Sequence, residues 1–220
     1  MNSPCRIVVL ISGLGSNLQA IIDACANKKI NGQVVAVISN RPDVLGLERA
    51  ARADIKAETL DHTKFPDRET FDRALKALIE SFSPDAVLLA GFMRILTTEF
   101  TQHFSGKMLN IHPSRLPKFR GLKTHQRALE AGEKTHGASV HFVTNELDGG
   151  PVILQSQLKI KPEHTAETLA ADVLKQEHVI YPQAVKWFCD GTLVLNNHHV
   201  LLNGKKLDNP IQLDDIESDF

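Results

Sequence analysis

The chain has 220 residues, of which 42% are hydrophobic and 23% are charged, and its formal net charge is -1. This composition predicts a globular protein with one well-covered core, and it excludes a general electrostatic attraction to nucleic acid or anionic membranes. The three cysteines lie far apart, so they indicate neither a disulfide framework nor a zinc site, and no apolar run is as long as a membrane span. We therefore expect a cytoplasmic protein that acts on small molecules.

The first half of the chain alternates apolar strands with amphipathic helices. Strands are predicted at residues 6–12, 33–40, 85–92 and 107–112. Helices are predicted between and after them, at 16–27, 44–53, 67–82 and 124–132. This alternation predicts a parallel sheet covered by helices on both faces.

The pattern changes in the second half. Strands at 136–144 and 151–160 are joined by a connection so short that it predicts an antiparallel pair. The segment 165–188 is predicted to be a long helix, capped by Thr165 and bent before Pro182.

A hairpin around Asn203 and Gly204 is predicted next. The predicted fold is α/β, with three layers and a mostly parallel central sheet whose C-terminal part is antiparallel. Residues 1–207 are expected to form a single domain, and the acidic segment 208–220 a mobile tail.

A glycine-rich turn, "SGLGSN" (12–17), leads from the first strand into the first helix. Glycines let the backbone approach a ligand, and the free amides at a helix N-terminus favour an anion. A dinucleotide-binding turn would have a third glycine where this chain has Leu18. The turn therefore predicts a site for a single phosphate monoester, and a tight turn without a ligand is the alternative. The predicted phosphate-binding residues are Gly15, Ser16 and Asn17.

Two polar residues, Asn110 and His112, end the fourth strand. Since they are two positions apart, they project to one face, at the edge where open α/β sheets bind ligands. An amide beside an imidazole offers two donors to an oxygen that gains negative charge when a carbonyl is attacked. Pro113 ends the strand and restricts the backbone of His112. The alternative is a capping asparagine and a buried, hydrogen-bonded histidine.

Asp148 stands in a short turn before two glycines. A carboxylate near His112 would orient the ring and favour its charged form, so that the pair could donate or relay a proton. An acidic residue beside glycines is also common in ordinary turns. His136 and His141 are five positions apart and point to opposite faces of a strand, so they do not predict a shared metal site.

Five stretches occur in a characteristic order: "VLISGLGSNLQAII", "AGFMRIL", "LNIHPSRLPKFRG", "HGASVHFVTNELDGGPVILQ" and "QEHVIYP". Together they resemble the folate-dependent glycinamide ribonucleotide formyltransferase family, from the first strand to about Trp187. The resemblance implies the formyltransferase fold with a Rossmann-like N-terminal half. It also implies transfer of a formyl group from the co-substrate 10-formyltetrahydrofolate to the amine of 5-phosphoribosylglycinamide, in purine (IMP) biosynthesis.

The resemblance implies a role for each residue that matches the family's motifs. The catalytic residues would be Asn110, His112 and Asp148. The ribonucleotide would be bound by Gly15, Ser16, Asn17, Leu174, Lys175, Gln176 and Glu177. The folate would be bound by Arg68, Met93, Arg94, Ile95, Leu96, Asn110, Thr144, Asn145, Glu146, Leu147 and Asp148. No metal is implied, and Arg115 and Arg120 depart from the family pattern.

Three other functions stay open. Methionyl-tRNA formyltransferase and formyltetrahydrofolate hydrolase share the fold, but they normally carry a further domain for which 220 residues leave no room. A noncatalytic nucleotide-binding module would keep the glycine turn without needing Asn110, His112 and Asp148 together. We expect small-molecule substrates, no nucleic acid or membrane partner, and a monomer or homodimer.

Overall fold

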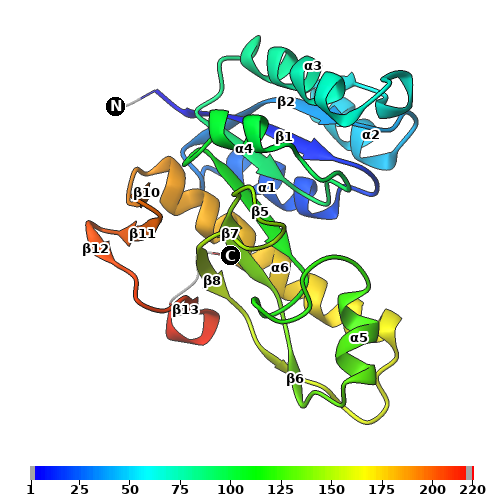
Figure 1. Cartoon of the computed structure of the whole chain (residues 1–220). Helices are drawn as coiled ribbons and strands as arrows, with labels where there is room; N and C mark the ends of the chain where they lie inside the picture. Colours follow the sequence, from blue (N-terminus) through cyan, green and yellow to red (C-terminus); the bar gives the residue numbers. More distant parts are fainter. Residues whose placement is uncertain (1–2, 217–219) are drawn as a thin grey trace. The chain divides into compact units, whose positions relative to one another are not determined.

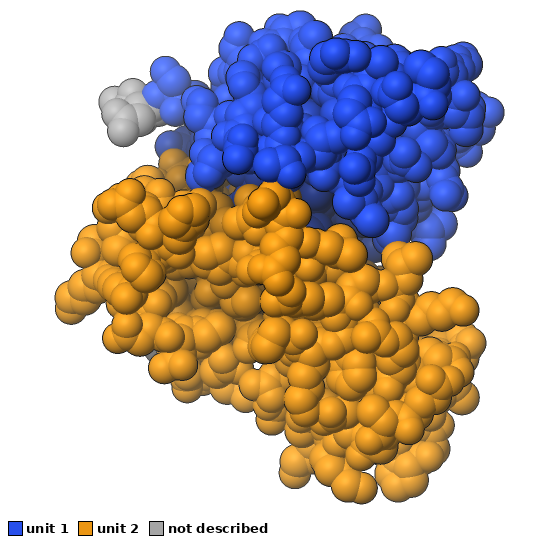
Figure 2. Space-filling model, viewed as in Figure 1, with its two compact units in different colours: residues 1–110 blue, residues 111–220 orange. Residues whose placement is uncertain are grey.

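Apolar runs in the first half of the chain form the parallel strands that the sequence predicts. The computed structural model describes residues 3–216 and residue 220, in two units that comprise residues 1–110 and 111–220 (Figure 2). In the first unit the strands lie in the order β4–β1–β2–β3, with the first three residues of β5 next to β4, and all neighbours are parallel. Their bounds are β1 Cys5–Ile11, β2 Gly32–Ser39, β3 Lys56–Thr59, β4 Ala86–Leu89 and β5 Met108–His112.

Burial explains why these runs are apolar. The side chains of β1 from Ile7 to Leu10 are fully buried, and so are those of β4 from Ala86 to Leu88. A strand covered on both faces needs apolar residues at consecutive positions, and each large side chain contributes about 1.5–3 kcal/mol on burial. β3 was not predicted, because it is an edge strand whose four residues are partly exposed and include two charges.

The helices of the first unit connect its strands (Figure 1). Their bounds are α1 Ser16–Ala26, α2 Leu45–Arg52, α3 Arg68–Glu80 and α4 Thr98–His103. The first three match the predictions, whereas α4 has only six residues and too little periodicity to be recognised. The carboxylate of Asp67 caps α3 by accepting the Thr70 N–H at 2.7 Å.

The second unit carries the antiparallel strands. β7 (Ser139–Phe142) pairs with β8 (Val152–Gln155), as predicted. α5 (Thr124–Glu130) precedes them, and the short strands β6 (Thr135–His136) and β9 (Leu158–Lys159) pair with each other. A three-stranded sheet follows α6, formed by β10 (Leu193–Asn196), β11 (His199–Leu202) and β12 (Lys205–Lys206). Its second turn contains Asn203 and Gly204, so the predicted hairpin is confirmed.

Helix α6 (Ala166–Cys189) begins after the predicted cap. The Thr165 hydroxyl accepts the Thr168 N–H at 3.3 Å, and the Thr168 hydroxyl accepts the Thr165 N–H at 2.9 Å. The helix continues through Pro182 to Cys189. The bend expected before Pro182 stays a prediction.

The acidic C-terminal segment, whose mobility stays a prediction, contains two short elements. Ile211 and Gln212 form β13, parallel to β8, and Leu213–Asp215 form a 3-10 turn, η2. A strand of two residues has no detectable periodicity, which is why the sequence does not reveal it. Residues 217–219 lie outside the described part of the chain.

The predicted fold class is confirmed, since parallel strands predominate in the central sheet and an antiparallel pair follows. The single domain predicted for 1–207 stays a prediction. Within residues 3–216, no helix combines the length and the apolarity needed to cross a membrane.

Candidate active site

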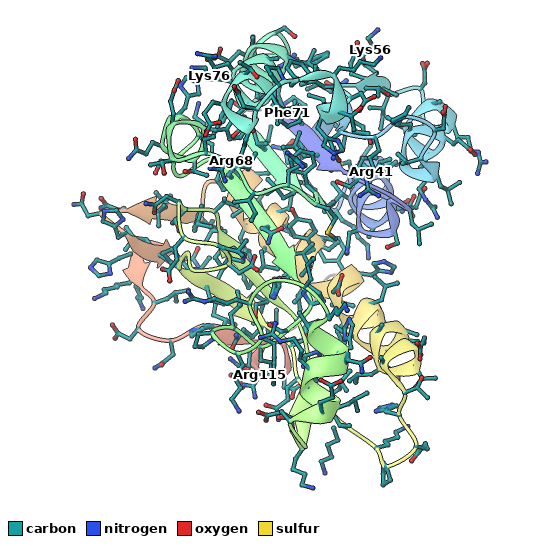
Figure 3. All side chains as sticks on the ribbon, turned by 45° about the vertical axis from the view of Figure 1, so that its right-hand side comes forward. Arg41, Lys56, Arg68, Phe71, Lys76 and Arg115 are labelled. Carbon is teal, nitrogen blue, oxygen red and sulfur yellow. The ribbon has the colours of Figure 1, made fainter. Side chains whose placement is uncertain are left out.

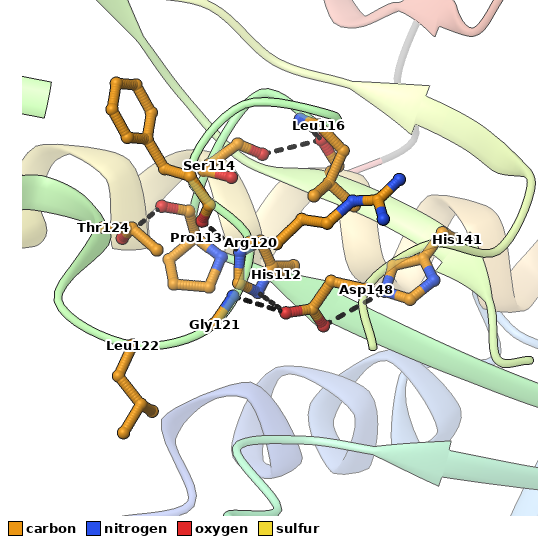
Figure 4. A network of polar contacts seen from close by, with 12 residues as sticks. His112, Pro113, Ser114, Leu116, Arg120, Gly121, Leu122, Thr124, His141 and Asp148 are labelled. Carbon is orange, nitrogen blue, oxygen red and sulfur yellow. Dashed lines mark hydrogen bonds and ion pairs between the residues drawn. The ribbon is translucent and has the colours of Figure 1, made fainter. Parts of the chain in front are cut away.

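His112 ends strand β5 and is 5% exposed. Its Nδ1 lies 3.4 Å from Oδ2 of Asp148, and its Nε2 lies 3.0 Å from the backbone oxygen of Phe119 (Figure 4). Both neighbours are hydrogen-bond acceptors. The ring can donate to both at once only when both nitrogens carry hydrogen, as in the imidazolium.

Asp148 lies between two histidines, His112 and His141 (Figure 4). Its Oδ2 accepts the Gly121 N–H at 2.8 Å, and its Oδ1 lies 3.8 Å from Nε2 of His141. The side chain is only 10% exposed, so solvent screens these charges weakly. The structure thus brings together the histidine and the carboxylate that the sequence places in separate turns.

The glycines after Asp148 have a structural cause. A Cβ on Gly150 would lie 1.9 Å from the backbone oxygen of Phe142, which is far inside contact distance. Only glycine allows the turn to close this tightly against β7. Asp148 itself has a φ of 47°, in the left-handed region that aspartate and asparagine tolerate better than most residues.

His141 is a residue of this cluster that the sequence analysis considered only as a metal ligand. It is 2% exposed, and its Nδ1 lies 2.8 Å from the Phe142 carbonyl, which accepts, so Nδ1 carries the hydrogen. Burial lowers the pKa of His141 to about 4, against the opposing effects of that carbonyl and Asp148. In the neutral ring, Nε2 carries a lone pair and lies 3.8 Å from Oδ1 of Asp148, beyond direct hydrogen-bond distance. In the sequence, the position of His141 inside an apolar strand is the feature that indicates a buried, hydrogen-bonded histidine.

Asn110 lies two residues before His112 on β5 and is half-buried. Alternation along the strand directs the two side chains to the same face. Its role as a second hydrogen-bond donor stays a prediction.

In the first unit, the glycine turn leads into α1 as predicted. Gly15 is the N-cap of α1, with φ +70°, and a Cβ there would lie 2.7 Å from Cα of Gly46 in α2. Packing against α2 therefore explains this glycine even without a ligand. Among the described residues no side chain caps α1, so the amides of its first turn, at Ser16 and Asn17, are suited to an anion.

The loop after β4 contains Met93, Arg94, Ile95 and Leu96. The Ser12 hydroxyl accepts the Met93 N–H at 2.7 Å, and a carboxylate oxygen of Asp72 accepts the Thr97 N–H at 2.6 Å. Burial raises the pKa of Asp72. The loop is therefore fixed at both ends while Met93 and Ile95, each 56% exposed, present apolar surface.

Two arginines near this loop have different surroundings. The Arg94 guanidinium lies over the Phe71 ring, 5.8 Å from its centroid. Arg68, in the first turn of α3, is exposed (Figure 3). Its Nη2 lies 3.7 Å from Oε1 of Glu69, and its side chain is 45% exposed, so the guanidinium can reach a charged ligand from solvent.

The remaining predicted residues belong to the second unit. In α6, Glu177 is buried and Leu174 half-buried, Gln176 donates to the Gln157 carbonyl at 3.2 Å, and Lys175 pairs with Asp172 at 2.7 Å. In the 144–148 turn Thr144 is half-buried, whereas three residues are exposed: Asn145, Glu146 and Leu147. Within the described residues, no group of three or more His, Cys, Asp or Glu side chains is placed to hold a metal.

This α/β fold, with a buried histidine–carboxylate pair at the carboxyl end of a parallel strand, is that of an enzyme suited to acid–base chemistry on a bound ligand. A family model described as "Formyl transferase" matches residues 5–185. The chain therefore belongs to the formyl transferase family.

Curated relatives and solved structures agree with this assignment. The chain is 54% identical over 202 residues to phosphoribosylglycinamide formyltransferase of Escherichia coli strain K12, covering 92% of this chain and 95% of the relative. It is 45% identical over 193 residues to the human trifunctional purine biosynthetic protein adenosine-3, covering 88% of this chain and 19% of the relative. The solved phosphoribosylglycinamide formyltransferase of Coxiella burnetii superposes with a TM-score of 0.90 at 49% identity, covering 95% of this chain and 99% of that one.

Proposed function

We propose that the protein transfers the formyl group of 10-formyltetrahydrofolate to the amine of 5-phosphoribosylglycinamide, a step of purine biosynthesis. The observation that carries the proposal is the buried contact of 3.4 Å between His112 and Asp148, within a chain 54% identical to a relative named for this activity. The formyl-folate hydrolase and tRNA formyltransferase alternatives are not favoured by these relatives.

The reaction is a direct attack. The neutral amine of the ribonucleotide bonds to the formyl carbon, whose oxygen becomes an oxyanion, and the bond from that carbon to the folate nitrogen then breaks. A proton leaves the amine and reaches the departing folate nitrogen. Holding the two substrates side by side makes the encounter effectively intramolecular, and no covalent enzyme intermediate is needed.

Asn110 and His112 stabilise the oxyanion as hydrogen-bond donors. In the structure, the Nε2 of His112 faces the Phe119 carbonyl, so its N–H must exchange that acceptor for the substrate oxygen. Asp148 keeps the ring oriented through Nδ1 and helps to move the proton from the amine toward the departing folate nitrogen.

Substrate binding follows from the surroundings of each group. Gly15, Ser16 and Asn17 bind the phosphate through the backbone amides at the start of α1, where no side chain caps the helix. Leu174, Lys175, Gln176 and Glu177 contact the same ribonucleotide, with Glu177 accepting hydrogen bonds from the ribose hydroxyls. The folate packs against the apolar side chains of Met93 and Ile95 and bonds to the backbone of Arg94 and Leu96. Arg68 and the 144–148 turn complete its binding site. The protein acts in the cytoplasm without a metal, as a monomer or homodimer.

An absorbance assay tests the activity. Conversion of 10-formyltetrahydrofolate is followed with and without 5-phosphoribosylglycinamide, and we expect turnover only when the amine is present. Turnover without the amine would indicate a hydrolase. No turnover in either case would favour a nucleotide-binding module.

Variants test the assigned donors. His112→Ala and Asn110→Ala should each lower kcat by about 100-fold to 1000-fold or more while still binding folate, because each removes one donor to the oxyanion. The matched control is His103→Ala, which changes an exposed histidine that pairs with Glu80. Wild-type turnover by purified His112→Ala protein would refute the assignment.

A further inference from the structure

One short backbone segment, residues 119–121, contacts both members of the histidine–aspartate pair. The Phe119 carbonyl lies 3.0 Å from Nε2 of His112, and the Gly121 N–H donates to Asp148 at 2.8 Å. The position of this segment therefore determines how the two side chains meet.

The side chain of the middle residue reaches the turn that carries Asp148. Arg120 Nη1 is in direct contact with Oε1 of Glu146, two residues before Asp148 (Figure 4 shows Arg120 beside Asp148). Glu146 also packs against Gly149, where a Cβ would lie 2.3 Å from its carboxyl carbon. Because Glu146 precedes Asp148 and contacts Gly149, which follows it, the ion pair connects the 119–121 segment to the turn on both sides of Asp148.

The other side of the segment is fixed to α5. The Arg120 carbonyl accepts from Nη1 of Arg127 at 2.6 Å, and the Arg127 guanidinium lies 5.5 Å from the centroid of the Phe119 ring. The segment is therefore anchored to α5 by Arg127. The ion pair of Arg120 with Glu146 is a second contact between this segment and the Asp148 turn, in addition to the hydrogen bond from Gly121 to Asp148.

We propose that Arg120 is a positioning residue for formyl transfer, which acts through Glu146 to hold the Asp148 turn at its distance from His112. It touches no reacting atom itself. The inference rests on the proposed roles of His112 and Asp148. It also gives a purpose to an arginine that departs from the motif of the family.

The expected effect separates positioning from stability. The Arg120 and Glu146 side chains are 37% and 61% exposed, and exposed ion pairs contribute little to folding. Misplacing a catalytic group by about 1 Å can lower the rate by about 100-fold. Since Gly121 still holds Asp148, we expect Arg120→Ala to lower kcat about tenfold, with an unchanged unfolding midpoint and little change in KM for the ribonucleotide.

Lys118 offers a matched control on the same loop. It forms an ion pair of 2.8 Å with Glu133, and its side chain is 62% exposed. Lys118→Ala should keep wild-type kcat. Arg120→Lys, which preserves the charge, should recover most of the activity that Arg120→Ala loses.

A spectroscopic readout is independent of activity. The Gly121 amide, which donates to a carboxylate, should give a downfield signal in a ¹H–¹⁵N spectrum of the full chain. In Arg120→Ala this signal should move upfield and its hydrogen exchange should accelerate, whereas Lys118→Ala should leave it unchanged.

The inference is overturned if Arg120→Ala keeps wild-type kcat, if Lys118→Ala loses as much activity, if Arg120→Lys recovers none, or if the Gly121 signal is unaffected. Failure of the proposed function has a different signature. Full activity of His112→Ala, or no formyl transfer by the wild-type protein, would remove it, and the Gly121 signal would still decide whether Arg120 holds the turn.

Discussion

Replacing Asp148 with asparagine removes a charge and leaves the fold of its turn intact. Asparagine tolerates the φ of 47° at this position, and its amide oxygen can still accept the Gly121 N–H. The charge lies 3.4 Å from the His112 ring. Only the part of this interaction that strengthens as the oxyanion forms enters the rate, and removing one preorganised electrostatic group from such a site typically costs about 100-fold to 1000-fold in turnover.

We therefore expect Asp148→Asn to lower kcat by about 100-fold to 1000-fold while KM for both substrates changes by less than about threefold. The absorbance assay for formyl transfer measures both constants, and thermal unfolding checks that the variant is folded. Asp190→Asn serves as the control, since it removes an equivalent charge from the ion pair with Lys186 at the end of α6. If Asp148→Asn keeps kcat within threefold of wild type, the electrostatic reasoning is refuted.

Three further substitutions test the fold around the site. Gly15→Ala places a Cβ 2.7 Å from Gly46 and should lower the free energy of unfolding by about 1–3 kcal/mol and raise KM for the ribonucleotide; unchanged urea unfolding would contradict this. Burial, followed by the neighbouring His125, lowers the pKa of His136 from 6.5 to about 4. Between pH 6.5 and pH 4 the His136 ring binds a proton in the unfolded chain but not in the folded one. The free energy of unfolding therefore falls as the pH drops through this range, by about 1.4 kcal/mol per pH unit from this residue, and His136 costs no stability above pH 6.5. His136→Gln should show a smaller slope in urea titrations. Thr165→Ala should lower stability by about 1 kcal/mol, measured the same way, because the cap of α6 is lost.

The sequence predicts the long, periodic elements of the fold. β1 and β2 are buried on both faces along most of their length, where their residues form apolar runs, and β4 is apolar throughout. Helix α3 buries Phe71, Leu75 and Ile79 at helical spacing. β3, β13 and α4 were missed because two to six partly exposed residues carry too little pattern. Short elements depend on tertiary pairing, which a single sequence does not display.

The candidate site is predictable only where side chains carry a motif. Asn110, His112 and Asp148 were recognised as candidates, and the structure brings His112 and Asp148 together. The contacts from Phe119 and Gly121 could not be foreseen, since they come from the backbone and join positions up to 27 residues apart. His141 could have been suspected, because a buried histidine needs a polar partner.

The contacts that orient His112 and Asp148 from residues 119–121 are made by peptide groups, and every residue type supplies the Phe119 carbonyl. Comparison of side chains among homologues therefore cannot detect these backbone contacts. Chemical editing of the main chain is not: exchanging the amide before Gly121 for an ester, by semisynthesis, would delete one N–H and keep every side chain. The loss of turnover in that product would measure the backbone's own share in catalysis.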